Sequence, residues 1–173
     1  MLSKIIPNWH PIFVHFTIAF FPIATVLIVS SLIINKNFKE KVLYCGYLNL
    51  WIGSLFTIFT VAAGFYAYNT VPHTNKLSHA VMTDHRNWAV ITATTFFALT
   101  IWSVKLYRNN HKQNLFFIMG LIIATVFLTI TGWKGSECVY RYGLGVMNLP
   151  NTDKHSRAIN SAPHEHSHEH AHV

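Results

Sequence analysis

The chain has 173 residues, enough for one compact domain, and 51% of them are hydrophobic against 11% charged. That balance is far from the composition of a soluble globular protein and is typical of an integral membrane protein. The formal net charge is +7, but the Lys and Arg residues are scattered through short segments rather than gathered into a stripe with interleaved aromatic residues, which argues against nucleic acid as a partner.

Long apolar stretches predict four membrane-spanning helices, at residues 11–34, 42–71, 79–104 and 114–133, each without a charge in its central turns. At about 1.5 Å per residue, each stretch can cross ~30 Å of hydrocarbon. The first stretch is too long for the apolar core of a signal peptide, so we expect it to be retained. Pro22 lies in its middle, where we expect a kink. Short connections make neighbouring helices antiparallel, so the predicted fold is an all-α, up-down four-helix membrane bundle over residues 1–149.

Basic residues indicate which connections stay in the cytoplasm, because Lys and Arg resist translocation. The first and third connections carry Lys36, Lys39, Lys41, Lys105, Arg108 and Lys112. The second offers Lys76 and Arg86 beside Asp84. Tryptophans, which favour the membrane interface, fall at the outer ends (Trp9, Trp88, Trp133) and the inner ends (Trp51, Trp102) of these stretches. The pattern predicts both termini on the outer side, followed by a disordered His-rich tail at 150–173.

Histidines in the outer half are the first candidates for chemistry. A histidine inside a bilayer is costly unless it pairs, binds a metal or faces a polar cavity, and His15 lies about one turn inside the first span. His85 lies about two turns into the third span, at a similar depth. Two imidazoles from separate helices at one level are what a b-type haem requires as axial ligands. The sequence therefore predicts one haem b, held by His15 and His85.

A glycine-rich segment, residues 132–146, follows the fourth span. Glycine at this density permits positive φ and a backbone lying close to helix ends or a ligand. Arg141 in this segment is a candidate cofactor-binding residue, because it can pair with a carboxylate, whether Asp84, Glu137 or a haem propionate. The alternative is a re-entrant turn that only caps the bundle.

Metal binding is the other chemistry that the histidines allow. His79, Met82 and His85 recur every three residues, and such ligands suit copper as well as zinc, with His10 as a further candidate ligand at the same end. The alternative is that these interfacial side chains are only solvated. The tail carries a stronger pattern, with histidine at every second position: His164, His166, His168, His170 and His172. Such tracts bind Zn, Cu or Ni with modest selectivity, unless the tract is an appended tag.

Two motifs resemble those of a bacterial family of four-helix membrane proteins, domain of unknown function 2231. The resemblance covers roughly residues 9–149. The first motif, H-P-x-x-V-H-F-P, is matched by His10, Pro11, Val14, His15 and Phe16, with Thr17 in place of the proline. The second, G-G-x-L-V-Y-x-H-G-V-G-V, is matched at Val139, Tyr140, Gly143, Gly145 and Val146, and departs at Ser136, Cys138, Tyr142 and Leu144. Tyr142 stands where the family commonly has histidine, which removes one ligand. The resemblance implies four helices in a bacterial inner membrane but no established reaction.

Three functions follow from these patterns. The first is electron transfer, or redox or metal sensing, by one haem or metal centre at the outer end, with another membrane redox protein as partner. The second is a non-catalytic scaffold or subunit whose histidines only form hydrogen bonds. The third is a metal-handling accessory that captures ions with its tail. Enzymatic turnover is not predicted, because the sequence contains no visible acid–base pair or nucleophile arrangement.

Overall fold

A computed structural model describes residues 9–71, 76–109 and 114–146 of the chain. They form four helices, α1 (His10–Ser30), α2 (Lys36–Thr70), α3 (Lys76–Arg108) and α4 (Leu115–Tyr140), and this part of the chain contains no strand. All four are long and apolar enough to cross a membrane. The prediction of an all-α protein with four apolar spans is confirmed. The predicted tail, with its alternating histidines, lies outside the described residues.

The helices differ from the predicted spans at their ends. α1 stops at Ser30, and residues 31–34, of which the last three are apolar, form a turn that leads to Asn35, whose side chain caps α2. α4 runs through the first half of the glycine-rich segment to Tyr140. Of that segment only Gly143 and Gly145 have positive φ, 62° and 79°. Gly143 donates its N–H to Val139 at 3.0 Å and so ends α4 with a left-handed residue, as helices commonly end.

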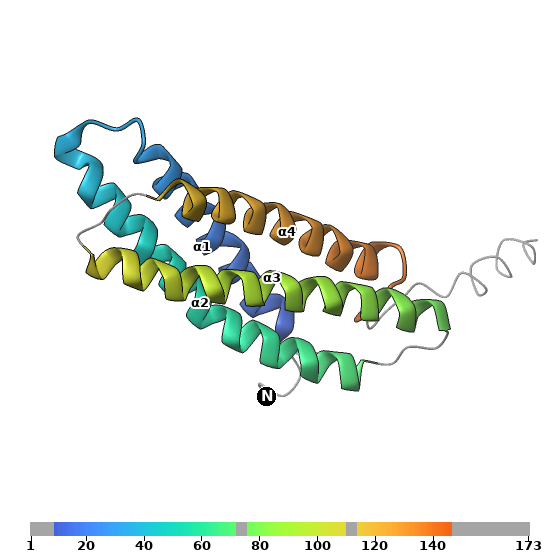
Figure 1. Cartoon of the computed structure of the whole chain (residues 1–173). Helices are drawn as coiled ribbons and strands as arrows, with labels where there is room; N and C mark the ends of the chain where they lie inside the picture. The colour runs from blue at the N-terminus through green and yellow to red at the C-terminus, as the bar shows by residue number, and fades with distance from the viewer. Residues whose placement is uncertain (1–8, 72–75, 110–113, 147–173) are drawn as a thin grey trace, which may run out of the picture.

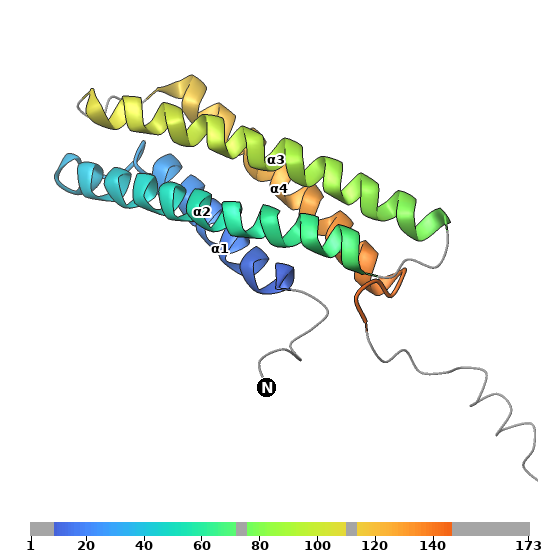
Figure 2. The ribbon, with the colours of Figure 1, turned by 90° about the horizontal axis from the view of Figure 1, so that it is seen from below.

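The four helices form an antiparallel bundle (Figures 1 and 2). α1 packs mainly on α2 and α3 on α4, while α1 lies diagonally opposite α3. We call the end where α1 and α3 begin the histidine end, because His10 and His85 lie there. The opposite end, which carries Lys36, Lys39, Lys41, Lys105 and Arg108, is the lysine end.

The bundle leaves most of its apolar surface uncovered. In each helix only 28% of the most apolar window is buried inside the structure. Val26, Phe116 and Ile101, for example, are 64%, 75% and 62% exposed. So large an apolar surface is unfavourable in water, and the backbone polar groups are satisfied within the helices, which is what hydrocarbon requires. The exposed faces are therefore the lipid-facing surface.

The two helical hairpins, α1–α2 and α3–α4, repeat one pattern of residues. The spacing H-x6-T-x3-F-x3-T occurs in α1 as His10, Thr17, Phe21 and Thr25, and in α3 as His85, Thr92, Phe96 and Thr100. The spacing L-x3-[ST]-x5-T-x3-G occurs in α2 as Leu50, Ser54, Thr60 and Gly64, and in α4 as Leu121, Thr125, Thr131 and Gly135. The chain is thus built from two equivalent halves.

Contacts between these residues repeat as well. Within the hairpins, the hydroxyls of Thr17 and Thr60 lie 2.9 Å apart and those of Thr92 and Thr131 lie 2.8 Å apart. Between the hairpins, the equivalent hydroxyl pairs are Thr25 with Thr125 at 2.9 Å and Ser54 with Thr100 at 2.6 Å. Equivalent helices run parallel, so a pseudo-twofold axis relates the halves along the bundle, as in membrane proteins with parallel repeats.

The equivalent phenylalanines meet on this axis. The rings of Phe21 and Phe96, both fully buried, stack with their centroids 3.7 Å apart and their planes 4° apart. Gly53 allows α2 to approach this stack, because a Cβ there would lie 2.8 Å from the Phe21 ring. Aromatic packing thus closes the middle of the bundle between the two ends.

Glycine packing in α2 gives a first prediction. A Cβ at Gly46 would lie 2.6 Å from Cγ1 of Ile28, whereas a Cβ at Gly132 would meet nothing within 4 Å. We expect Gly46→Ala to destabilise the bundle by about 1–3 kcal/mol through overpacking. Gly132→Ala is the matched control, and should be neutral or stabilising by up to about 1 kcal/mol because alanine is the better helix former. Unfolding in mixed detergent micelles measures both, and equal effects would contradict this view of α2.

Candidate two-histidine site

His10 and His85 meet at the histidine end, on the pseudo-twofold axis. Their ring centroids are 6.3 Å apart, and their planes are nearly perpendicular, at 75°. Both side chains are half-buried. The first comes from the first turn of α1 and the second from α3, so two diagonal helices bring one imidazole each to the same place.

Each ring is held by a backbone carbonyl of the partner helix in its own hairpin. Nδ1 of His10 lies 2.9 Å from the carbonyl oxygen of Thr60, and Nδ1 of His85 lies 3.2 Å from that of Thr131. A carbonyl oxygen only accepts, so Nδ1 carries the proton in both rings. The neutral rings then have their lone pair on Nε2, the tautomer in which that nitrogen can bind a metal.

A glycine lies against each ring. A Cβ at Gly64 would lie 3.0 Å from Cε1 and Nδ1 of His10, and a Cβ at Gly135 would lie 3.0 Å from Cε1 of His85. Each glycine follows the threonine whose carbonyl accepts the hydrogen bond by four residues, one turn along the same helix face. The absence of a side chain at these two positions therefore makes room for the imidazoles.

Threonine hydroxyls join the two helices of each hairpin below the rings. Thr60 donates its hydroxyl proton to the carbonyl of Phe56 at 3.0 Å, and Thr131 donates to Phe127 at 2.9 Å. A hydroxyl has one proton to donate, so in each pair the threonine of α1 or α3 is the donor to its partner. The carbonyl that orients each histidine thus belongs to a residue whose own side chain is fixed.

Charged residues surround the site at the histidine end. Asp84, next to His85 in the chain, forms a salt bridge with Lys134 of α4. Arg141 pairs with Glu137 at 2.7 Å, one turn earlier in the chain. Of the two protein carboxylates considered from the sequence, Glu137 is thus the partner of Arg141, and Asp84 pairs with Lys134 instead. Both ion pairs are partly exposed, and such pairs stabilise a protein by at most about 1 kcal/mol each.

The structure brings His10 against His85 and leaves His15 on the surface of α1. His15 follows His10 by five residues, which is about 140° around a helix with 3.6 residues per turn. Its side chain is exposed, and its Nδ1 contacts the carbonyl oxygen of Pro11 in its own helix. The depth of His15 does not place its ring beside His85, because the face of the helix differs.

The other predicted ligands are dispersed. Nε2 of His79 lies 3.5 Å from the hydroxyl of Tyr68, which also bonds the Thr83 hydroxyl at 2.9 Å. Met82 is half-buried. Within residues 9–71, 76–109 and 114–146, no three His, Cys, Asp or Glu side chains gather where they could hold a metal ion. His73 and the histidines of the tail lie outside these ranges.

Sequence reasoning missed the pairing of His10 with His85, although the signal was present. Both histidines open the same spacing, H-x6-T-x3-F-x3-T, and equivalent residues of a repeat meet where they lie near its axis. A search for internal repeats would have paired them.

Comparisons with known proteins assign the family. No curated protein and no solved structure matches the chain. A family model described as "Predicted membrane protein (DUF2231)" matches residues 7–148, which include all four helices. The resemblance read from the two motifs at the ends of this region is confirmed. The chain therefore belongs to the DUF2231 family of predicted membrane proteins.

Proposed function

We propose that this protein binds one haem b between His10 and His85 and serves in electron transfer at the membrane. The observation that carries the proposal is the pair of equivalent imidazoles, 6.3 Å apart, each with Nδ1 on a backbone carbonyl. Histidines that ligate a metal almost always donate their other ring N–H in this way. Haem b with two axial histidines needs one imidazole from each of two helices.

The number of ligands favours haem over a structural zinc ion. Zinc takes four ligands, whereas a haem brings four equatorial nitrogens and needs two from the protein. Among the described residues only the two imidazoles converge. Metal–nitrogen bonds of about 2 Å place the centres of two axial imidazoles about 6 Å apart, similar to the separation of the rings.

Orientation and partners complete the proposal. The lysine end faces the cytoplasm by the positive-inside rule, and the histidine end faces the outer side of a bacterial inner membrane. A bound haem supplies one-electron oxidation and reduction at that end, so the partner is another one-electron carrier, in the membrane or at its outer surface. Arg141, on the adjacent end of α4, is the candidate to meet a propionate, in exchange for its exposed pair with Glu137.

A structural role is the second candidate, and one observation favours it. Both rings already have a carbonyl partner and pack on glycine, so the imidazoles join helices even without a ligand. In that role the protein is a non-catalytic membrane scaffold. Metal capture by the His-rich tail is a separate proposal, which deletion of residues 151–173 tests.

An optical spectrum of the purified chain separates these candidates. The full-length protein, without an added affinity tag, is made in cells supplied with haem, purified in detergent and titrated with haemin. We expect a Soret band, sharp α and β bands after reduction and one haem per chain by iron analysis. Monodisperse, helical protein that takes up no haemin and holds no iron, copper or zinc would support the scaffold role instead.

A further inference from the structure

Four polar side chains meet where α2 ends and α3 begins. The hydroxyl of Tyr68, in the last turn of α2, lies 2.9 Å from the hydroxyl of Thr83 and 3.5 Å from Nε2 of His79. The guanidinium carbon of Arg86 lies over the ring of Tyr68, 4.7 Å from its centre. His79, Thr83 and Arg86 follow one another by about one turn each, so they share one face of α3. We call these four residues the tyrosine cluster.

The tyrosine cluster lies at the level of the lipid headgroups. α2 and α3 have 35 and 33 residues. Each is thus about 50 Å long, which exceeds the ~30 Å of the hydrocarbon core. Both helices extend past the start of α1 at the histidine end (Figures 1 and 2). The last turns of α2 and the first turns of α3 therefore lie among the headgroups of that leaflet, and the long side chain of Arg86 can reach the same level.

Arg86 has no carboxylate partner in the part of the chain that the structure describes, although its side chain is half-buried. Its Nε and Nη2 donate to the neutral amide oxygen of Asn87 at 3.3 and 3.1 Å, which uses two of the five N–H donors of a guanidinium. The carboxylates described at this end, Asp84 and Glu137, are both paired with cations of α4. The ring of Tyr68 attracts the guanidinium but does not neutralise its charge. An anion is therefore the partner that this side chain lacks.

The equivalent place in the repeat carries no such cluster. The spacing of the two halves pairs Tyr68 with Val139 and Arg86 with Pro11, neither of which has a polar side chain. The packing of the bundle therefore does not require a phenol and a guanidinium at this position.

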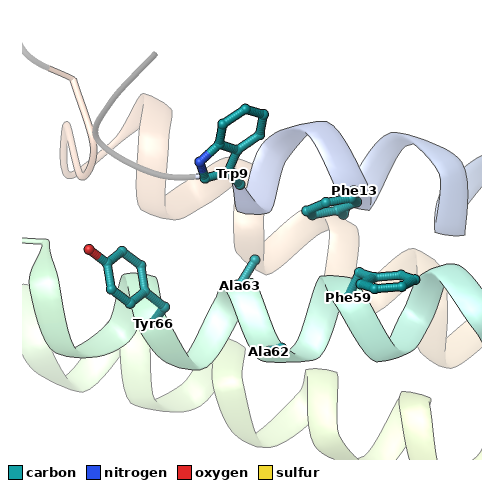
Figure 3. A pocket seen from close by; sticks show the side chains of 6 residues that line it. All are labelled: Trp9, Phe13, Phe59, Ala62, Ala63 and Tyr66. Atoms are coloured by element: carbon teal, nitrogen blue, oxygen red, sulfur yellow. The ribbon is translucent and has the colours of Figure 1, made fainter. Parts of the chain in front are cut away.

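The neighbouring surface of α2 is apolar and differs from the tyrosine cluster. Tyr66 lies about 160° round the helix from Tyr68, beside an apolar groove between α1 and α2 that contains no charged side chain (Figure 3). The groove is lined by Trp9, Phe13, Phe59, Ala62, Ala63 and Tyr66. On this helix, the polar contacts to Arg86 and its neighbours are thus confined to the side that faces α3.

We propose that the tyrosine cluster binds the phosphate of an anionic phospholipid. A guanidinium binds phosphate oxygens through paired N–H donors, and basic pockets between membrane helices bind anionic headgroups. The hydroxyls of Tyr68 and Thr83 use one proton between them, which leaves the other to donate. The cluster contains no carboxylate to meet the ammonium of a zwitterionic lipid, so a headgroup with net negative charge is favoured. It shares no residue with the two-histidine site, so this proposal and the proposed function stand or fall separately.

Photolabelling in nanodiscs of phosphatidylcholine tests the site. The full chain is labelled with a phosphatidylglycerol that carries a photoactivatable headgroup, with and without excess phosphatidylglycerol, and the labelled peptides are identified. We expect saturable labelling of the peptides that contain Tyr68 and Thr83. Arg86→Gln removes charge-assisted hydrogen bonds and should reduce this labelling at least about 10-fold. Arg108→Gln, the same change at the opposite end of α3, is the matched control and should leave the labelling of these peptides unchanged.

Two milder variants provide measures that do not depend on Arg86→Gln. Tyr68→Phe removes one hydroxyl and should reduce the labelling about 2- to 10-fold. Arg86→Lys keeps the charge without the paired donors, so its labelling should fall between that of the unmodified chain and that of Arg86→Gln. Circular dichroism shows whether each variant remains helical.

Four results would overturn the proposal. The first is unchanged labelling of folded Arg86→Gln. The second is equal competition by phosphatidylethanolamine, which would show that net negative charge is not recognised. The third is equal competition by soluble glycerol phosphate, which would assign the cluster to a free phosphate ester instead of a lipid. If Arg86→Gln fails to fold, unchanged labelling of Tyr68→Phe is the fourth.

Discussion

Replacing either histidine of the axial pair with glutamine should abolish haem binding while leaving the bundle intact. Glutamine can still donate a hydrogen bond to the carbonyls of Thr60 or Thr131, but it does not replace imidazole as an iron ligand. Loss of an outer-shell partner of a ligating histidine already costs about 10- to 100-fold in affinity, and loss of the ligand itself should cost more. We therefore expect His10→Gln and His85→Gln each to lose the Soret band in haemin titrations.

His15→Gln is the matched control for these variants. His15 lies in the same helix and the same half of the membrane, but its exposed ring contacts only its own helix. It should bind haem as tightly as the unmodified chain. The reverse result, binding lost in His15→Gln and kept in His10→Gln, would restore the pairing of His15 with His85 that depth alone predicted. A circular dichroism spectrum of each variant shows whether the helices remain.

Truncating the ring pair in the middle of the bundle should give the largest loss of stability. Lipid tails are as apolar as the interior of a membrane bundle, so burying an aromatic ring there gains no hydrophobic transfer energy. The cost of truncating the ring is therefore the cavity that remains and the packing contacts that are lost. For Phe21→Ala or Phe96→Ala we expect about 2 kcal/mol each, towards the lower part of the range for large-to-small changes. Steric trapping or unfolding in mixed micelles measures this.

The double variant, with Phe21→Ala and Phe96→Ala combined, tests whether the two rings stabilise the bundle by packing on each other or only by being apolar. The two rings touch, so the combined cost should fall short of additivity by about 0.5–1.5 kcal/mol. Phe116→Ala, at a position that is 75% exposed to lipid, should change stability by less than about 0.5 kcal/mol. Equal effects at Phe21 and Phe116 would contradict the assignment of the stacked rings as the centre of the bundle.

The internal duplication explains how one site can use two distant segments. Each half of the chain supplies a histidine, a carbonyl to orient it, a threonine pair and a glycine beside the ring. A ligand on the pseudo-twofold axis would therefore contact two equivalent imidazoles. The halves differ on their outer surfaces, where one carries an open groove and the other Trp133 with an ion pair. The two halves are thus equivalent in the interior of the bundle and differ on its outer surface.

The sequence by itself determined the membrane class, the number of helices and the family. These depend on local quantities, the length and apolarity of each stretch and the spacing of residues within two motifs, which hold whatever the neighbours do. The positions of the helix ends followed less closely from the sequence than the number of helices did. The apolar residues 32–34 lie in a turn rather than in a helix. α4 continues through Gly132 and Gly135, because Gly135 packs on His85 rather than breaking the helix.

Only the tertiary structure decided which histidines face each other. Sequence placed His10 and His15 in the same half of the membrane, since depth follows from position along a helix. The face that each presents depends on how α1 packs against α2 and α4, and five residues turn it by about 140°. The groove likewise required the structure, because Ala62 and Ala63 leave a hollow only where Trp9 and Phe13 of another helix stand beside them. Depth is a property of one helix, whereas a site is a property of the packing of several.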